Sequence, residues 1–141
     1  MALKFHPNAG AILHCDYSTG FRSPEMIKPR PVVVITPRLR NRDSLCAVVP
    51  LSLTDPHNPQ AYHLKVKMSP LLPPPWDSPE CWAKADMMAT VSYERLTPYY
   101  LGRGRDGKRI YYTTLLKPEV IREIQRAVLW GLNLGHLTQH V

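Results

Sequence analysis

The fold of this chain follows from one segment, Lys28-Pro29-Arg30-Pro31-Val32-Val33-Val34-Ile35-Thr36-Pro37. Its four consecutive β-branched apolar residues, bounded by prolines, are typical of a short strand that is buried on both faces. Arg30 stands between two prolines, and each proline restricts its own backbone and that of the preceding residue. Glu25 lies five residues upstream. An arginine held in this way can anchor a structural carboxylate or bind a phosphate, and the segment alone leaves both open.

Length and composition predict a single domain over residues 1–141. The chain has 141 residues, of which 44% are hydrophobic and 21% charged, as in ordinary globular proteins with a core of their own. Fifteen prolines favour a loop-rich, mainly β domain over a helical bundle. No apolar run approaches the length of a membrane span, and no hydrophobic leader is evident, so we expect a cytoplasmic protein.

Charge and cysteine content indicate which partners and which compartment suit this protein. A formal net charge of +7 favours a polyanionic partner, either nucleic acid or an acidic protein. Cys15, Cys46 and Cys81 are widely spaced and form no C-x-x-C pair, which predicts buried free thiols in a reducing compartment. No spacing of His, Cys, Asp and Glu indicates a zinc site, and His14 and His63 suit structural roles on strands.

The remaining pattern predicts five to seven short strands and one helix. Strands are expected at 10–17, 31–36, 45–50, 61–68 and 81–91, followed by 92–96 and by a hairpin, 99–101 with 109–113, that turns at Asp106-Gly107. Residues 69–80 hold five prolines and predict an extended loop pinned by Trp76. Pro118 opens a helix within 117–134, with apolar residues at three- and four-residue spacing and Gly131 or Gly135 at its end. We therefore expect a mainly β fold, a strongly bent sheet or partly open barrel capped by the helix.

Three motifs, taken in order, resemble the MazF/PemK family, the ribonuclease toxins of bacterial type II toxin–antitoxin modules. They are Gly10-x-Ile12-x-x-x-Asp16-Tyr17, then Glu25-x-x-x-x-Arg30-Pro31 with the strand after it, then Val48-Val49-Pro50-Leu51-Ser52. The resemblance covers about residues 10–95 and the C-terminal helix, with the 69–80 loop and the 99–113 hairpin as additions. It implies an SH3-like barrel that forms a homodimer, cleaves single-stranded RNA sequence-specifically without a metal or other cofactor, and is neutralised by an antitoxin.

The resemblance also implies a set of site residues. Arg30 and Ser52 match the central active-site groups, and Lys84 with Asp86 matches the basic residue and aspartate of the plasmid-type members. Ser52 stands where threonine is usual, Lys84 where arginine is usual, and Met87 where glutamine is common. The lysine matters most, because only arginine offers a planar two-pronged donor to a phosphate.

RNA cleavage through a 2′,3′-cyclic phosphate needs a base for the 2′-OH, a cation for the phosphorane and an acid for the leaving 5′-oxygen. We expect Arg30 to stabilise the phosphorane and to be a candidate acid, and Ser52 to bind a non-bridging oxygen. Glu25 or Asp86 is expected to act as the base or to orient Arg30, since a carboxylate is an easier base than arginine. Without the motifs, an Arg30–Glu25 ion pair closing a loop is the simpler interpretation.

Four basic residues and one threonine are further candidates for RNA binding. The candidates are Lys84, Thr54, Arg38, Arg40 and Lys28, although Thr54 also suits a simple strand end. The cations of 38–42 and 103–109, the latter beside four tyrosines, fit a single strand with phosphates on the cations and bases on the rings. The same surfaces fit an acidic, disordered antitoxin tail that folds on binding.

Two rival functions remain open at this point. Trp130-Gly131-Leu132 faintly resembles the C-terminal Trp-Gly-Ile of the gyrase-poisoning toxin CcdB, although nine residues follow it here. A degenerate toxin that only binds RNA or its partner is the other rival, because of the departures at Lys84 and Met87.

Overall fold

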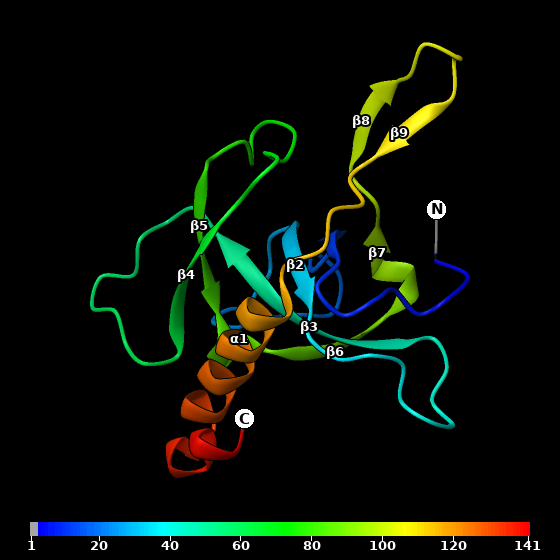
Figure 1. The fold of residues 1–141 in the computed structure, drawn as a ribbon. Coiled ribbons are helices and arrows are strands. Elements are labelled where there is room, and N and C mark those ends of the chain that lie inside the picture. The colour runs from blue at the N-terminus through cyan, green and yellow to red at the C-terminus, as the bar shows by residue number, and fades with distance from the viewer. Residues whose placement is uncertain (1–2) are drawn as a thin grey trace.

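A computed structural model describes residues 3–141 and shows a bent, open antiparallel sheet with one long helix packed against it (Figure 1). Seven strands form the main sheet in the order β4-β5-β3-β2-β1-β7, with β6 also paired to β3. The strands of this sheet are β1 (Ile12–Cys15), β2 (Arg30–Val34), β3 (Leu45–Ser52), β4 (His63–Lys67), β5 (Glu80–Lys84), β6 (Ala89–Ser92) and β7 (Leu96–Thr97). Strands β8 (Tyr100–Arg103) and β9 (Arg109–Tyr111) pair with each other in a separate two-stranded sheet. The end strands β4 and β7 do not close the sheet, so the expected partly open, mainly β architecture is confirmed.

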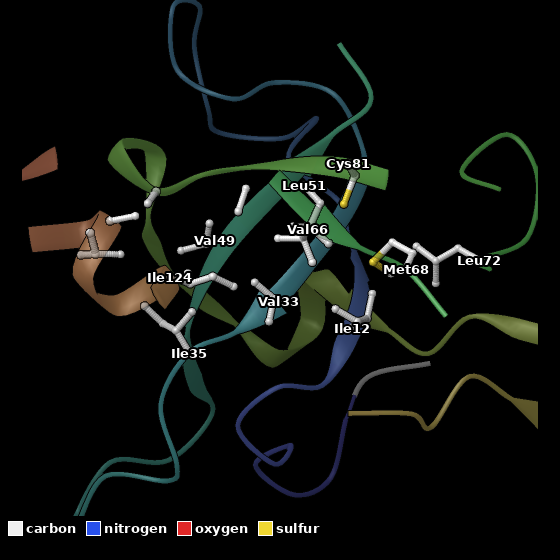
Figure 2. Packing of buried hydrophobic residues seen from close by; sticks show 14 of the residues in the cluster. Ile12, Val33, Ile35, Val49, Leu51, Val66, Met68, Leu72, Cys81 and Ile124 are labelled. Atoms are coloured by element: carbon white, nitrogen blue, oxygen red, sulfur yellow. The ribbon is translucent and has the colours of Figure 1, made fainter. Parts of the chain in front are cut away.

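Strand β2 lies between two hydrophobic clusters, as its sequence predicts. Val32, Val33 and Val34 are completely buried; Val33 packs into one cluster, and Val32 and Val34 pack into the other. Figure 2 shows Val33 among Ile12, Val49 and other members of the first cluster. Each buried valine contributes about 1.5–3 kcal/mol relative to an exposed one, so this strand stabilises both sides of the sheet. It begins one residue earlier than expected, at Arg30, and ends at Val34.

The expected strand over 81–91 is wrong, because a three-residue 3₁₀ turn, η1 (Ala85–Met87), divides it into β5 and β6. Both parts pair with the same edge of β3. From Ala83 opposite Leu51 to Ala89 opposite Val48 the chain advances six residues, whereas β3 advances three. The three extra residues leave the ladder as an irregular bulge, and bulges are over-represented next to active sites.

Helix α1 (Pro118–Gly131) covers the first cluster and contacts η1. Ile124, Ala127 and Val128 form its buried face, in agreement with the apolar spacing. The helix ends at Gly131, where a side chain would come within 2.9 Å of the Asp86 Cα atom, and a short 3₁₀ helix, η3 (Gly135–His140), follows. Glycine at this position therefore allows the helix to approach the bulge. Within residues 3–141, no helix combines the length and apolarity that a membrane crossing requires.

The other local predictions can be compared with the structure directly. Strand β4 buries Val66 and exposes Lys65 and Lys67, as its alternation indicates, and the hairpin turn forms at Gly107. The 69–80 loop contributes a buried Leu72 and a partly buried Trp76 to the first cluster, so the predicted anchoring role of Trp76 is shared with Leu72.

The three cysteines are free and buried, as predicted. Burial raises the pKa of Cys15 and of Cys46 to about 11, and that of Cys81 to about 12, from an ordinary value of 9.0. Well below pH 9 nearly all thiols are protonated in both the folded and the unfolded chain. As the pH rises through 9, the unfolded chain loses protons that the folded chain retains. We therefore expect the free energy of unfolding, from urea titrations, to fall as pH rises from 9 towards 11.

Alkylation gives an independent readout of the same burial. With iodoacetamide at pH 8, mass spectrometry should find the native protein unmodified and the urea-unfolded protein modified at all three cysteines. Equal labelling of the native and unfolded chains would contradict the burial of these thiols.

Candidate functional site

The sheet register brings Arg30 and Ser52 together. The β2–β3 ladder ends with Val32 opposite Pro50, and extending its antiparallel register by two residues sets Arg30 opposite Ser52. Directly opposite residues point to the same face of a sheet, so the guanidinium and the hydroxyl lie on one face. The two residues are distant in the sequence, and only strand pairing makes them neighbours.

The same row continues into β5 and β4. Ser52 is opposite Trp82, and Trp82 is opposite Lys65. The Trp82 indole N–H donates to Asp55 Oδ1 at 2.7 Å, and the Lys65 ammonium lies 5.3 Å from the centroid of the indole ring. Lys84, two residues after Trp82, points to the same face. An aromatic ring held by a hydrogen bond therefore lies between cations, next to Ser52.

Arg30 has no carboxylate partner within ion-pair distance among residues 3–141. Its Nε donates to the Lys28 carbonyl at 3.3 Å, and its side chain is half-buried. Burial lowers the pKa of Arg30, because a desolvated cation is less stable, and the nearby Tyr17 phenol opposes this effect. The loop-closing ion pair with Glu25 does not form, so the guanidinium keeps its capacity to bind an anion.

Ser52 has only 4% of its surface exposed, and it is the only buried polar or charged residue over 3–141. Its Oγ accepts a hydrogen bond from the Thr54 backbone N–H at 3.1 Å, which fixes the oxygen at the strand end. The Thr54 side chain is exposed, so Thr54 contributes through its backbone. The Ser52 O–H remains available as a donor to a phosphate oxygen.

Glu25 and Asp86 line one pocket of about 240 Å³. The β1–β2 loop supplies Glu25, whose Oε1 accepts from the Arg22 backbone N–H at 3.0 Å, and the η1 bulge supplies Asp86. The other lining residues are mainly aromatic or apolar: Tyr17, Phe21, Met26, Met87, Met88 and Ala89. Over residues 3–141 no third His, Cys, Asp or Glu joins the pair, as a three-ligand metal group would require.

Tyr17 connects this pocket to Arg30. It is fully buried, it lines the pocket, and its hydroxyl has no hydrogen-bond partner within the described chain. Burial raises the pKa of Tyr17, and Arg30 is among the charges that oppose this increase, so the two groups are close enough to interact electrostatically. The two carboxylates and the Arg30–Ser52 row thus belong to adjoining parts of one surface.

Three basic residues proposed from the sequence are placed differently. Strand β2 begins at Arg30 and ends at Val34, so its far end lies about 13 Å from Arg30. Arg38 and Arg40 lie in the loop beyond that end. Figure 1 shows their loop, between β2 and β3, on the opposite side of the molecule from the β8–β9 hairpin. Arg38 is also paired with Asp43 at 2.5 Å. Lys28 is exposed, and its backbone carbonyl accepts a hydrogen bond from Arg30. The structure therefore does not bring Arg38 and Arg40 to the site.

Sequence reasoning missed Trp82 and Tyr17 as site residues. Trp82 could have been found from strand alternation, because it lies two residues before Lys84 and so on the same face. Tyr17 closes the first family motif, but the sequence did not indicate its role, because its position near Arg30 depends on the pairing of β1 with β2.

Comparisons with known proteins find similar sequences. A family model described as "PemK-like, MazF-like toxin of type II toxin-antitoxin system" matches residues 8–131. The protein YifN of Escherichia coli (strain K12) is 32% identical over 151 residues, covering 94% of this chain and 96% of that protein.

Solved structures show the same fold. A mycobacterial endoribonuclease in complex with its cognate antitoxin has a TM-score of 0.57 at 19% identity, over 91% of this chain and 96% of that one. MazF from Deinococcus radiodurans has a TM-score of 0.57 at 16% identity, over 92% and 99% of the two chains.

Proposed function

Because this chain belongs to the PemK-like, MazF-like toxins of type II toxin–antitoxin systems, we propose that it is a metal-independent, sequence-specific endoribonuclease that cleaves single-stranded RNA. The observation that supports this most directly is the Arg30–Ser52 pair. A half-buried guanidinium, with no carboxylate partner among residues 3–141, faces a buried hydroxyl when the β2–β3 register is extended by two residues. This combination suits a phosphate that gains negative charge during reaction.

The proposed reaction uses these groups as follows. The RNA 2′-oxygen attacks the adjacent phosphorus and gives its proton to Glu25 or Asp86. Arg30 binds the phosphorane, and Ser52 donates a hydrogen bond to a non-bridging oxygen. The bond to the 5′-oxygen breaks, leaving a 2′,3′-cyclic phosphate, and Arg30 is the candidate proton donor to that oxygen because burial lowers its pKa.

The residues of the same row beyond Ser52 are suited to binding the substrate. The Trp82 ring offers a face on which a base can stack, and Lys65 and Lys84 offer cations for phosphates on either side. Lys65 also forms an exposed ion pair with Glu80 at 3.9 Å, which a phosphate would have to displace. Bases must be unstacked from a helix to reach such a ring, which favours single-stranded RNA as the substrate.

We also propose an acidic antitoxin as partner, a homodimeric assembly and a cytoplasmic location. A cleft of about 490 Å³ runs between β4 and α1, with three lysines (65, 67 and 117) and one carboxylate, Glu123, beside Leu115, Leu116 and Val120. Mixed apolar and cationic lining suits an acidic, amphipathic segment, and one similar structure contains a cognate antitoxin. The three buried free thiols suit a reducing cytosol.

The test is incubation of purified protein with a long RNA in EDTA. We expect discrete fragments ending in a 2′,3′-cyclic phosphate, identified by mass spectrometry. Failure to cleave, with inhibition of DNA supercoiling, would instead support a gyrase inhibitor, and absence of both activities would support a binding-only homologue. The geometry gives the gyrase rival no support. The Trp130 ring packs on Gly135 at the start of η3, so the Trp-Gly-Leu tripeptide lies at the end of α1, ahead of a second helix, and not at a free C-terminus.

A further inference from the structure

The β8–β9 hairpin forms an arm, residues 100–111, that projects from the body of the protein (Figure 1). Tyr99 and Tyr112 form its base and are buried in the first cluster. The Tyr112 N–H donates to the Tyr99 carbonyl at 2.8 Å, and the Tyr112 hydroxyl donates to the Pro70 carbonyl at 2.8 Å. The arm is therefore firmly held at its base, while its two strands form a separate two-stranded sheet.

Apolar side chains along the arm are exposed to solvent. Tyr100, Leu101 and Ile110 are each nearly half exposed, and Tyr100 packs edge-on against Tyr111 with centroids 5.9 Å apart. A lone two-stranded hairpin is marginally stable in water, so these side chains contribute little to the fold. Exposed rings on such an element are better explained by a ligand than by folding.

The charges of the arm favour an anionic ligand. Four cations, Arg103, Arg105, Lys108 and Arg109, accompany one carboxylate, Asp106. Arg103 and Arg109 are directly opposite each other, an arrangement of like charges that destabilises a hairpin. No carboxylate in residues 3–141 is within ion-pair distance of these cations. A bound polyanion removes this repulsion.

We propose that the arm is a second RNA-binding element, which holds single-stranded RNA outside the segment that is cut. Bases stack on Tyr100 and Tyr111, and phosphates bind Arg103 and Arg109. Stacking on tyrosine tolerates any base, so the arm adds affinity for long RNA without adding sequence specificity. The inference rests on the proposed function, because RNA is the polyanion that rings and cations bind together.

The test compares the variant Tyr100→Ala/Arg103→Ala/Arg109→Ala with wild type on two RNAs that share one cleavage site. A short RNA of about 8 nucleotides fills the site alone, and one of about 30 nucleotides extends well beyond it. We expect KM to rise about tenfold on the long RNA and to stay unchanged on the short one, with kcat unchanged on both. Loss of two phosphate contacts should also reduce the slope of log Kd against log salt by about 1.4.

Lys4→Ala/Arg122→Ala is the matched control, since it removes two exposed cations from other surfaces and should leave KM on both RNAs unchanged. Fluorescence anisotropy with labelled long RNA measures the affinity that the arm contributes, even if the protein does not cleave RNA. Tenfold weaker binding there supports the arm, even if the nuclease proposal fails. Equal affinity of the arm variant and wild type for long RNA overturns the proposal, and selective loss of binding to polyglutamate would assign the arm to an acidic protein.

Discussion

Replacement of Arg30 by alanine is expected to lower kcat/KM for RNA cleavage by about a thousandfold, at the upper end of the effect of removing one oxyanion donor. The guanidinium is half-buried, lacks a carboxylate partner among residues 3–141 and, by extension of the β2–β3 register, faces Ser52, so its charge is available to a phosphate bound there. The fold should survive. Arg30 makes one recorded hydrogen bond, to the Lys28 carbonyl, and its loss should cost about 1 kcal/mol of unfolding free energy or less. Single-turnover rates and thermal melts measure the two effects.

Two further variants sharpen this experiment. Arg22→Ala removes an exposed cation from the β1–β2 loop and should leave the rate close to that of wild type. Arg30→Lys keeps the charge but loses the planar fork, so it should recover only part of the activity. If Arg30→Ala cleaved RNA as fast as wild type, the proposed role of the guanidinium would have to be abandoned.

The second large effect is expected from Ser52→Ala. Loss of the buried hydroxyl removes a hydrogen bond to the phosphorane, and kcat should fall about tenfold to a hundredfold with little change in KM. The Thr54 N–H also loses its acceptor, which should reduce the free energy of unfolding by about 1 kcal/mol. Steady-state kinetics and urea titration separate the catalytic loss from the structural one.

The chain contains a matched control for this variant. Ser92 ends strand β6 as Ser52 ends β3, and its Oγ accepts from the Glu94 N–H at 3.2 Å. Ser92→Ala should therefore cause a similar loss of stability and no loss of kcat. Equal kinetic defects in the two variants would show that Ser52 acts through strand-end geometry and not through its hydroxyl.

Local sequence alone determined most of the architecture. Consecutive β-branched residues bounded by prolines predicted β2 and its burial on both faces, and Pro118 predicted the start of α1. The hairpin turn at Gly107 and the buried thiols were likewise predictable. These features depend on backbone restriction, on periodicity and on the low polarity of neighbouring residues, which are properties of short segments.

Only the tertiary structure decided which groups meet. Strand register places Arg30 opposite Ser52 and adds Trp82 to the row, whereas it leaves Arg38 and Arg40 at the far end of β2. The η1 bulge could not be predicted, because residues 85–87 leave the ladder through pairing with β3 and contact with α1, and no local pattern marks them. Periodicity tells which face a side chain takes, but its neighbours across a sheet depend on pairing between distant segments.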